Sequence, residues 1–360
     1  MTLLASLAQA GGASDPLTPF YTFIRMQPQD VAIQIVDISK ERSRQDVLSW
    51  NAKQPMPLAS SMKIVVLAAY ARAVAAGRLD PNASVTLAEW EQFYLPGTDG
   101  GAHANSLQAL KIPADKSGRA QDSQKTVSLD ALARFMVETS DNAATDALLN
   151  RLGKNAVTDT SAALGLRQQG DIGPIAGMFT AWEKEGKKYL LLSPGERRER
   201  DWYWAEQVRH MPALRQPAPL NRQVSPAELA QAMALANRTP PLGSAGEYAS
   251  LMASVLTGQG FAPAELAVMR RHLGWPLRAN PANRTVFTAL YAKGGSLGAG
   301  VLTNNFALEF KNGNRVVYSI MFRNIPLDLY AGFSHGLEDF MLATLTDPKA
   351  QEKLLEALGH

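Results

Sequence analysis

Ser60 and Lys63 are the pair of side chains in this sequence with the clearest chemical potential. Ser60 is the only serine of the chain that is followed three positions later by a lysine. Residues three apart share one face of a helix, so the Lys63 amine can reach the Ser60 hydroxyl. The stretch from Met62 to Ala76 is apolar on nearly every face, which predicts a helix in the middle of the protein. Because burial penalises an ammonium ion, we expect a lowered pKa for Lys63 and a neutral amine that can serve as a general base.

The same pair is also compatible with a purely structural role. Serine often caps helices, and lysine often buries its apolar stem while its ammonium group stays in water. If Ser60 stands at the helix start, the free N–H groups there could stabilise an oxyanion. Ser60 and Lys63 alone therefore leave both interpretations open.

A second segment with chemical potential, Ser140-Asp141-Asn142, lies between two predicted helices. Serine, aspartate and asparagine ordinarily serve as turn and cap residues at such a place. Combined with Ser60 and Lys63, the Ser140 hydroxyl could relay a proton to a leaving nitrogen, and the Asn142 amide could hold a substrate carbonyl.

The third such segment, Lys293-Gly294-Gly295-Ser296, ends a predicted strand. Glycines there let a substrate backbone approach the sheet edge, and a lysine can attract a carboxylate. A glycine-containing bulge or turn is the structural alternative. The segment is not a phosphate loop, because the lysine precedes the glycines.

In this order, the three segments resemble the signature of class A β-lactamases and penicillin-binding proteins. The resemblance covers most of the chain from about Val31 to Leu345. It implies an acyl-enzyme mechanism without metal or cofactor on a small β-lactam or a peptidoglycan-like peptide. The roles that it implies are nucleophile for Ser60, base for Lys63, proton relay for Ser140, substrate binding for Asn142, Lys293, Gly295 and Ser296, and an oxyanion site at the backbone N–H groups of Ser60 and Ser296.

Two departures from the family pattern concern turnover. Class A β-lactamases carry a Glu-x-x-Leu-Asn loop motif that activates the deacylating water, and no such motif follows Asn142. Glu183 and Glu185 are substitutes on sequence position only. Gly294 stands where a threonine or serine hydroxyl is usual, so a contact to the substrate carboxylate is missing unless Ser296 supplies it. We therefore expect acylation with slow deacylation.

The pattern of elements predicts an α+β fold. Strands are expected near both ends of the chain, at 31–38, 46–50, 285–293, 301–311 and 316–323, and helices at 62–76, 129–138, 143–152, 226–236, 245–256 and 337–345. This predicts one antiparallel sheet built from both termini and flanked by helices, with an inserted helical lobe, as in the β-lactamase and transpeptidase fold. The expected lobes are 17–60 with 283–360 for the sheet and 61–282 for the helices, with an atypical segment at 167–223.

Composition narrows the class of protein. The chain has 360 residues, is 46% hydrophobic and carries a net charge of +3 from 36 basic and 33 acidic residues, a balance that gives no argument for nucleic acid. It has no cysteine, its five histidines show no metal-ligand spacing, and its longest apolar run is too short to span a bilayer. Leu3 to Ala10 resembles the end of a secretory signal, which favours a periplasmic or secreted protein; a frayed N-terminal helix within the tail 1–16 is the alternative.

Two other functions remain open on the sequence. The missing loop glutamate mildly favours a D-alanyl-D-alanine carboxypeptidase or an esterase. A non-catalytic binding module with the same fold is the third hypothesis, although binding alone has no need of a buried lysine beside a serine.

Overall fold

The computed structural model describes residues 15–40, 43–215 and 225–359. The expected signal remnant at Leu3 to Ala10 lies outside these residues. Within them the chain forms two compact units. One contains the described residues up to Ser61 together with Gly243–Gln259 and Gly274 onward, and the other contains Met62–Leu242 and Gly260–Leu273.

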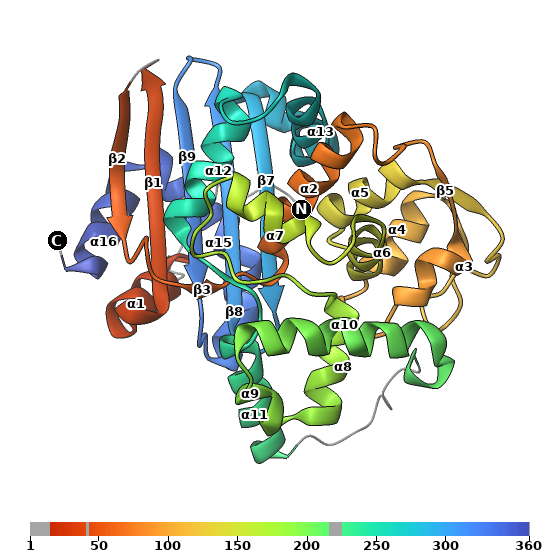
Figure 1. The fold of residues 1–360 in the computed structure, drawn as a ribbon. Coiled ribbons are helices and arrows are strands. Elements are labelled where there is room, and N and C mark those ends of the chain that lie inside the picture. The colour runs from red at the N-terminus through yellow and green to blue at the C-terminus, as the bar shows by residue number, and fades with distance from the viewer. Residues whose placement is uncertain (1–14, 41–42, 216–224, 360) are drawn as a thin grey trace. The chain divides into compact units, whose positions relative to one another are not determined.

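The first unit is built around a five-stranded antiparallel sheet with the strand order β2-β1-β9-β8-β7 (Figure 1). The predicted sheet assembled from both ends of the chain is therefore confirmed. Its strands are β1 Val31–Lys40, β2 Ser43–Trp50, β7 Phe287–Leu297, β8 Val301–Phe310 and β9 Arg315–Phe322. The short strand β3 Met56–Pro57 and the 3₁₀ turns η1 Pro28–Asp30 and η5 Pro281–Thr285 belong to the same unit.

Helices cover both faces of this sheet. The helix α12, Ala245–Thr257, packs against β1, β8 and β9. The other face carries a hydrophobic cluster to which alternate residues of the strands contribute, as the two-residue period of a strand requires. The helices that complete this cluster are α1 Thr18–Met26, α15 Leu327–Thr346 and α16 Pro348–Leu358; α14 Trp275–Ala279 packs beside β7.

The C-terminal helix differs from the sequence-based expectation. The prediction of one closing helix at 337–345 was wrong, because α15 already begins at Leu327 and α16 follows it. Gly332 and Gly336 interrupt the helical pattern in the sequence. Gly336 has a packing reason, since a Cβ atom there would lie 3.2 Å from Cε2 of the Phe20 ring. Close packing between α1 and α15 thus overrides the low helix propensity of glycine.

The second unit is helical, and α2, Lys63–Ala75, lies in its core. Ten of the thirteen residues of α2 are buried, which confirms the predicted buried helix. The helices α5 Leu129–Glu138, α6 Asn142–Leu152, α7 Ala156–Ala163 and α13 Pro263–Leu273 pack against it. The unit also contains β4 Ser84–Thr86, α3 Leu87–Trp90, η3 Glu91–Phe93, α4 Ala102–Ala109 and β5 Thr126–Ser128. The 3₁₀ turn η2 Ala59–Met62 and the strand β6 Leu242–Gly243 are the elements at which the chain passes from one unit to the other.

The atypical segment 167–223 is mostly helical where it is described. It contains α8 Ile175–Glu185, α9 Lys187–Leu190, α10 Pro194–His210 and η4 Pro212–Arg215, and α11 Pro226–Arg238 follows. A capping box between Ser193 and Glu196 starts α10, with Pro194 in its first turn. In α10, Trp204 packs on the small core cluster around Tyr189, whereas Tyr203 is 49% exposed. No helix in the described part of the chain is both long enough and apolar enough to be a membrane span.

Gly177 lies at a point of very close approach between α8 and α10. A Cβ atom on Gly177 would lie 1.7 Å from the backbone oxygen of Asp201. Real Cβ atoms do not occur at such distances, so the packing of these two helices requires glycine at this position.

We therefore predict that Gly177→Ala destabilises the protein by at least about 2 kcal/mol, because α8 must move away from α10. Helix propensity alone predicts the opposite sign, a gain of about 1 kcal/mol. The matched control is Gly195→Ala in α10, where a Cβ atom meets nothing within 4 Å. Urea denaturation of the three proteins measures the difference, and equal stability of the two variants would contradict the close approach.

Candidate active site

The Lys63 side chain is the most constrained group of the predicted site. Lys63 is the first residue of α2 and is fully buried. Its Nζ atom donates to the backbone oxygen of Ser140 at 2.6 Å, to the Ser140 Oγ at 3.3 Å and to the Asn142 Oδ1 at 2.7 Å. The helical unit thus brings together three of the predicted site residues, and each contact involves a side chain or loop that the sequence places far from Lys63.

Burial also changes the acidity of this amine, as expected from the sequence. Loss of water lowers the pKa of Lys63 to about 8, although the carboxyl groups of Asp141, Asp146 and Asp99 act to raise it. About a tenth of the amine is then neutral at pH 7. A lysine in this state can accept a proton.

The loop between α5 and α6 presents its acceptors to Lys63 through an unusual backbone conformation. Ser140 has φ of 65°, a left-handed conformation that costs a residue with a side chain about 1–2 kcal/mol. The next residue, Asp141, caps α6 by accepting the Ala144 N–H at 2.9 Å. The cap and the two flanking helices hold Ser140 in the conformation that exposes its carbonyl oxygen to the amine.

Asp146, on α6, is a second buried carboxyl group of this unit. Its two oxygens accept the backbone N–H groups of Ile175 and Ala176, each at 2.7 Å, and so cap the start of α8. Burial raises the pKa of Asp146 to about 7, against the opposing effects of these N–H groups and of Lys63. Asp146 thus has two effects: its carboxyl group caps α8, and its negative charge acts to raise the pKa of Lys63.

Ser60 belongs to the sheet unit and lies in η2, two residues before the chain enters the helical unit. Its neighbour Ser61 is fully buried, and the Ser61 Oγ bonds to Thr303 Oγ1 at 2.7 Å and accepts from Asn305 Nδ2 at 2.9 Å. Asn305 is in turn held by the Ser319 hydroxyl at 2.7 Å. This buried network, Ser61-Thr303-Asn305-Ser319, attaches the Ser60 turn to β8 and β9.

Gly295 brings β7 against the same turn. A Cβ atom on Gly295 would lie 2.6 Å from the Ser60 nitrogen and 2.6 Å from the Leu58 oxygen. The glycine thus has a structural reason in this chain beyond access for a substrate. Lys293 is 4% exposed and donates to the Gly294 oxygen at 2.7 Å, whereas Ser296 is exposed.

The two acidic residues considered for water activation have other partners. The Glu185 Oε1 accepts from Trp204 Nε1 at 2.7 Å and pairs with Arg200 at 3.1 Å. Glu183 is exposed and lies beside Lys184. The contacts of Glu185 favour a structural role for that residue.

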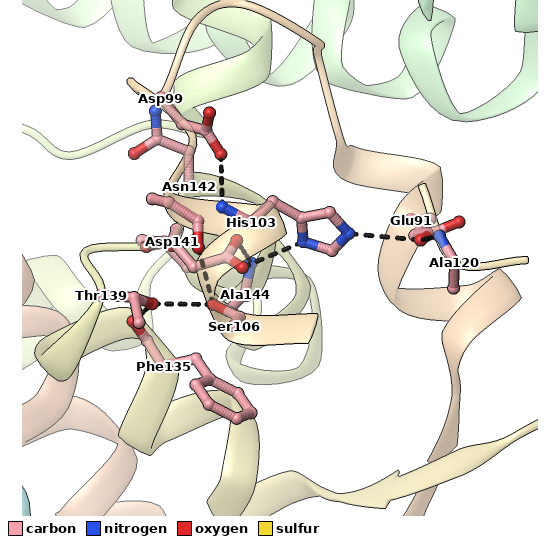
Figure 2. Close-up of polar contacts among 12 residues, drawn as sticks. Glu91, Asp99, His103, Ser106, Ala120, Phe135, Thr139, Asp141, Asn142 and Ala144 are labelled. Carbon is pink, nitrogen blue, oxygen red and sulfur yellow. Dashed lines mark hydrogen bonds and ion pairs between the residues drawn. The ribbon is translucent and has the colours of Figure 1, made fainter. Parts of the chain in front are cut away.

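Sequence reasoning missed a buried histidine next to the Ser140-Asn142 loop. The His103 Nδ1 lies 3.0 Å from the Asp141 Oδ2, and its Nε2 lies 3.2 Å from the Glu91 Oε1 (Figure 2). Nothing in the spacing of His103 and Asp141, 38 positions apart, indicates this contact. Within the described residues, no group of three or more histidine, cysteine, aspartate or glutamate side chains has an arrangement suited to a metal ion.

The chain is similar to one known family and to several solved structures. It matches the model of the beta-lactamase enzyme family over residues 22–326. No protein with a curated function matches it. Three solved β-lactamase structures each superpose with a TM-score of 0.53.

The first of these, from Sphaerobacter thermophilus, is 19% identical, and the match covers 92% of this chain and 99% of that chain. One from Chitinophaga pinensis is 13% identical, with coverage of 88% and 95%. The chromosome-encoded β-lactamase of Vibrio parahaemolyticus is 11% identical, with coverage of 92% and 100%. At these identities the likeness to the three structures concerns the fold, and it confirms the predicted β-lactamase and transpeptidase architecture. The family match extends over most of the chain, and the protein therefore belongs to the beta-lactamase enzyme family.

Proposed function

We propose that this protein is a serine hydrolase that forms an acyl-enzyme at Ser60 with a β-lactam or a related amide or peptide. The observation that carries the proposal is the buried Lys63 amine, held by Ser140 and Asn142 and with a pKa of about 8. Lys63 follows Ser60 by three positions, with two residues between them, so covalent connectivity alone limits the distance between the hydroxyl and the amine.

The proposed reaction has two stages. The Ser60 Oγ bonds to the substrate carbonyl carbon while its proton passes to the neutral Lys63 amine. The carbon–nitrogen bond then breaks, and the proton reaches the leaving nitrogen through the Ser140 hydroxyl. Water finally hydrolyses the ester, releases the acid and restores the Ser60 hydroxyl.

The remaining predicted residues are assigned to substrate binding. Lys293 supplies positive charge for a substrate carboxylate, and the Asn142 amide binds a substrate carbonyl. Ser296 is exposed and provides the hydroxyl that Gly294 lacks. The backbone N–H groups of Ser60 and Ser296 stabilise the oxyanion, and Gly295 keeps that strand close to Ser60. With such substrates, the protein acts in the periplasm or outside the cell.

The fate of the acyl-enzyme separates this function from the second candidate. Glu183 and Glu185 are bound elsewhere, and the chain has no Glu-x-x-Leu-Asn motif after Asn142. This favours slow hydrolysis of a β-lactam ester. A D-alanyl-D-alanine carboxypeptidase or an esterase, for which β-lactams are inhibitors, is therefore the second candidate. A purely binding role is disfavoured, because it needs no buried amine of lowered pKa.

Incubation with a penicillin should add the mass of one intact penicillin to the protein, since acylation opens the ring without loss of atoms. Intact-protein mass spectrometry should show this adduct in the parent and in Ser334→Ala, a change on the exposed face of α15. Ser60→Ala should give none. An adduct of equal yield in Ser60→Ala would refute the assignment of the nucleophile.

The acylation rate should depend on pH through Lys63. Only the neutral amine accepts the Ser60 proton, so the rate should rise about tenfold per pH unit below pH 8 and level off above it. Lys63→Arg keeps the charge but cannot lose its proton, and it should acylate at least about 100-fold more slowly. Stopped-flow measurements between pH 5.5 and about 9.5 test both statements; a flat profile would be inconsistent with a lysine base.

Turnover assays should separate the two candidate substrates. We expect a penicillin to give a burst of one equivalent followed by slow release. Fast hydrolysis of a D-alanyl-D-alanine peptide or a nitrophenyl ester, with β-lactams only inhibiting, would select the carboxypeptidase or esterase instead.

A further inference from the structure

Three ionisable side chains are buried together beside the Ser140-Asn142 loop, and the proposed acylation step uses none of them directly. They are Glu91 of η3, His103 of α4 and Asp141 at the start of α6 (Figure 2). His103 and Asp141 have no exposed surface, and Glu91 is 6% exposed. Burial of three charged groups is costly unless they compensate one another.

The geometry defines the protonation state of His103. Each ring nitrogen faces a carboxylate oxygen, Asp141 at 3.0 Å and Glu91 at 3.2 Å. A neutral imidazole has one N–H, so one of the two contacts would set a nitrogen lone pair against an anionic oxygen. With both carboxyl groups ionised, both contacts are favourable only for the imidazolium ion, which donates to each of them.

The surroundings hold this arrangement in place. The Asp99 Oδ2 accepts the His103 backbone N–H at 2.8 Å, and the Glu91 Oε1 also accepts the Ala120 N–H at 2.5 Å. The Tyr94 ring lies 4.3 Å from the imidazole, centroid to centroid. The guanidinium of Arg119 lies over that ring and donates to the backbone oxygens of Glu91 and Tyr94.

The titratable groups that face the imidazole are Glu91, Asp99, Tyr94 and Asp141. Arg119 and Arg215 lie next to the Glu91 side of the cluster, and Lys63 and Asp146 act on Asp141. Burial by itself lowers the pKa of His103, but Asp141 and Glu91 raise it to about 9. In return, the His103 cation keeps the pKa of Asp141 below its ordinary value although Asp141 is buried.

Asp141 connects this cluster to the Lys63 amine. Of the carboxyl groups that raise the pKa of Lys63, Asp141 has the largest effect, ahead of Asp146 and Asp99. An uncompensated negative charge at Asp141 would keep a proton on the amine. The Lys63 Nζ contacts Ser140 and Asn142, the two chain neighbours of Asp141, and the imidazole nitrogen lies 3.0 Å from the Asp141 oxygen. A positive charge on the imidazole therefore acts on Lys63 in the direction opposite to the charge of Asp141.

We propose that His103 is a positioning residue that, as an imidazolium ion clamped between Glu91 and Asp141, cancels the charge of Asp141 so that Lys63 can serve as a neutral base. The inference rests on the proposed function of Lys63, and it assigns a role in that function to a histidine outside the three signature segments. It also explains how an aspartate can cap α6 one residue from the Ser140 relay without trapping the proton on Lys63.

The test is the titration of Lys63 in variants of the cluster, followed by NMR of ¹³C-labelled lysine and assigned with Lys63→Arg. In His103→Gln the Lys63 midpoint should move upward by about 1 pH unit. The double variant His103→Gln with Asp141→Asn should move it back to the parent value or below. The rising limb of the acylation profile should move by the same amount as the midpoint. An unchanged or lower midpoint in His103→Gln would overturn the proposal.

A matched control separates charge compensation from support of the loop. The Ser106 Oγ bonds to Thr139 and to the Ala102 oxygen, and it is also a neutral hydrogen-bond partner of Asp141. Ser106→Ala removes this support but no charge, so it should lower thermal stability without moving the Lys63 midpoint. An equal midpoint shift in Ser106→Ala would mean that His103 acts only as scaffolding, and would also overturn the proposal.

One readout requires no variant and no substrate. In the unmodified protein, ¹⁵N NMR should show both ring nitrogens of His103 protonated at pH 7, because the pKa of His103 is about 9. A neutral ring at pH 7 would overturn the proposal even if His103→Gln did not fold. If the parent failed to acylate with any substrate, the proposed function would fail, but the Lys63 and His103 titrations would still decide this inference.

Discussion

A buried amine must be given hydrogen-bond acceptors or lose its proton, and this constraint on Lys63 governs the helical unit. Lys63 has no exposed surface, and its three acceptors come from a single loop. To present them, Ser140 adopts a left-handed backbone conformation, which the cap at Asp141 and the helices α5 and α6 sustain. The acceptors offset only part of the cost of burial, so the pKa of Lys63 is lowered to about 8 and part of the amine is uncharged at neutral pH.

The electrostatics around this amine depend on a chain of compensations. Asp141 and Asp146 are both buried, and each caps a helix through backbone N–H groups. A buried carboxylate close to Lys63 raises the pKa of the amine and so opposes its deprotonation. For Asp141, we propose that the positive charge of His103 compensates this effect. The pKa of Asp146 is raised to about 7 by its burial, so its own charge is reduced near neutral pH. In the sheet unit, the turn that contains Ser60 is held by neutral groups only. The hydrogen-bond network of Ser61, Thr303, Asn305 and Ser319 attaches this turn to the sheet and adds no charge to it.

Much of the fold could be predicted because its elements carry local signals. The strand at 31–38 and the helices at 62–76 and 129–138 each show their pattern within a short stretch of sequence, and the structure has them at nearly the predicted positions. The length of α15 could not be predicted, because glycine ordinarily weakens a helix. The contact that explains Gly336, with the Phe20 ring, involves a residue more than 300 positions away in the chain. The helices of the segment 167–223 could not be predicted for the same reason, which is that they depend on contacts between distant residues. Gly177 of α8, for example, is explained only by its contact with α10.

The residues of the candidate site also divide into those with a local sequence pattern and those without one. Ser60, Lys63, Ser140 and Lys293 stand in short patterns, so their residue types and spacing suggest a chemistry, and the burial of Lys63 follows from its helix. His103, Glu91 and Asp146 stand in no pattern, because their partners lie on other elements and act on Lys63 through charge. Side chains that act on the Lys63 amine through other residues are therefore the ones that a single sequence cannot indicate.

The proposed chemistry requires that a fraction of the Lys63 amine is uncharged at neutral pH, so that it can take a proton from the Ser60 hydroxyl. The most direct measurement is the titration of its amine in the unmodified protein without substrate, followed at the lysine ε-carbon by NMR. We expect a midpoint near 8, well below the ordinary value of 10.5 for lysine. A midpoint at or above 10.5 would mean that Lys63 remains an ammonium ion at neutral pH and cannot serve as a base.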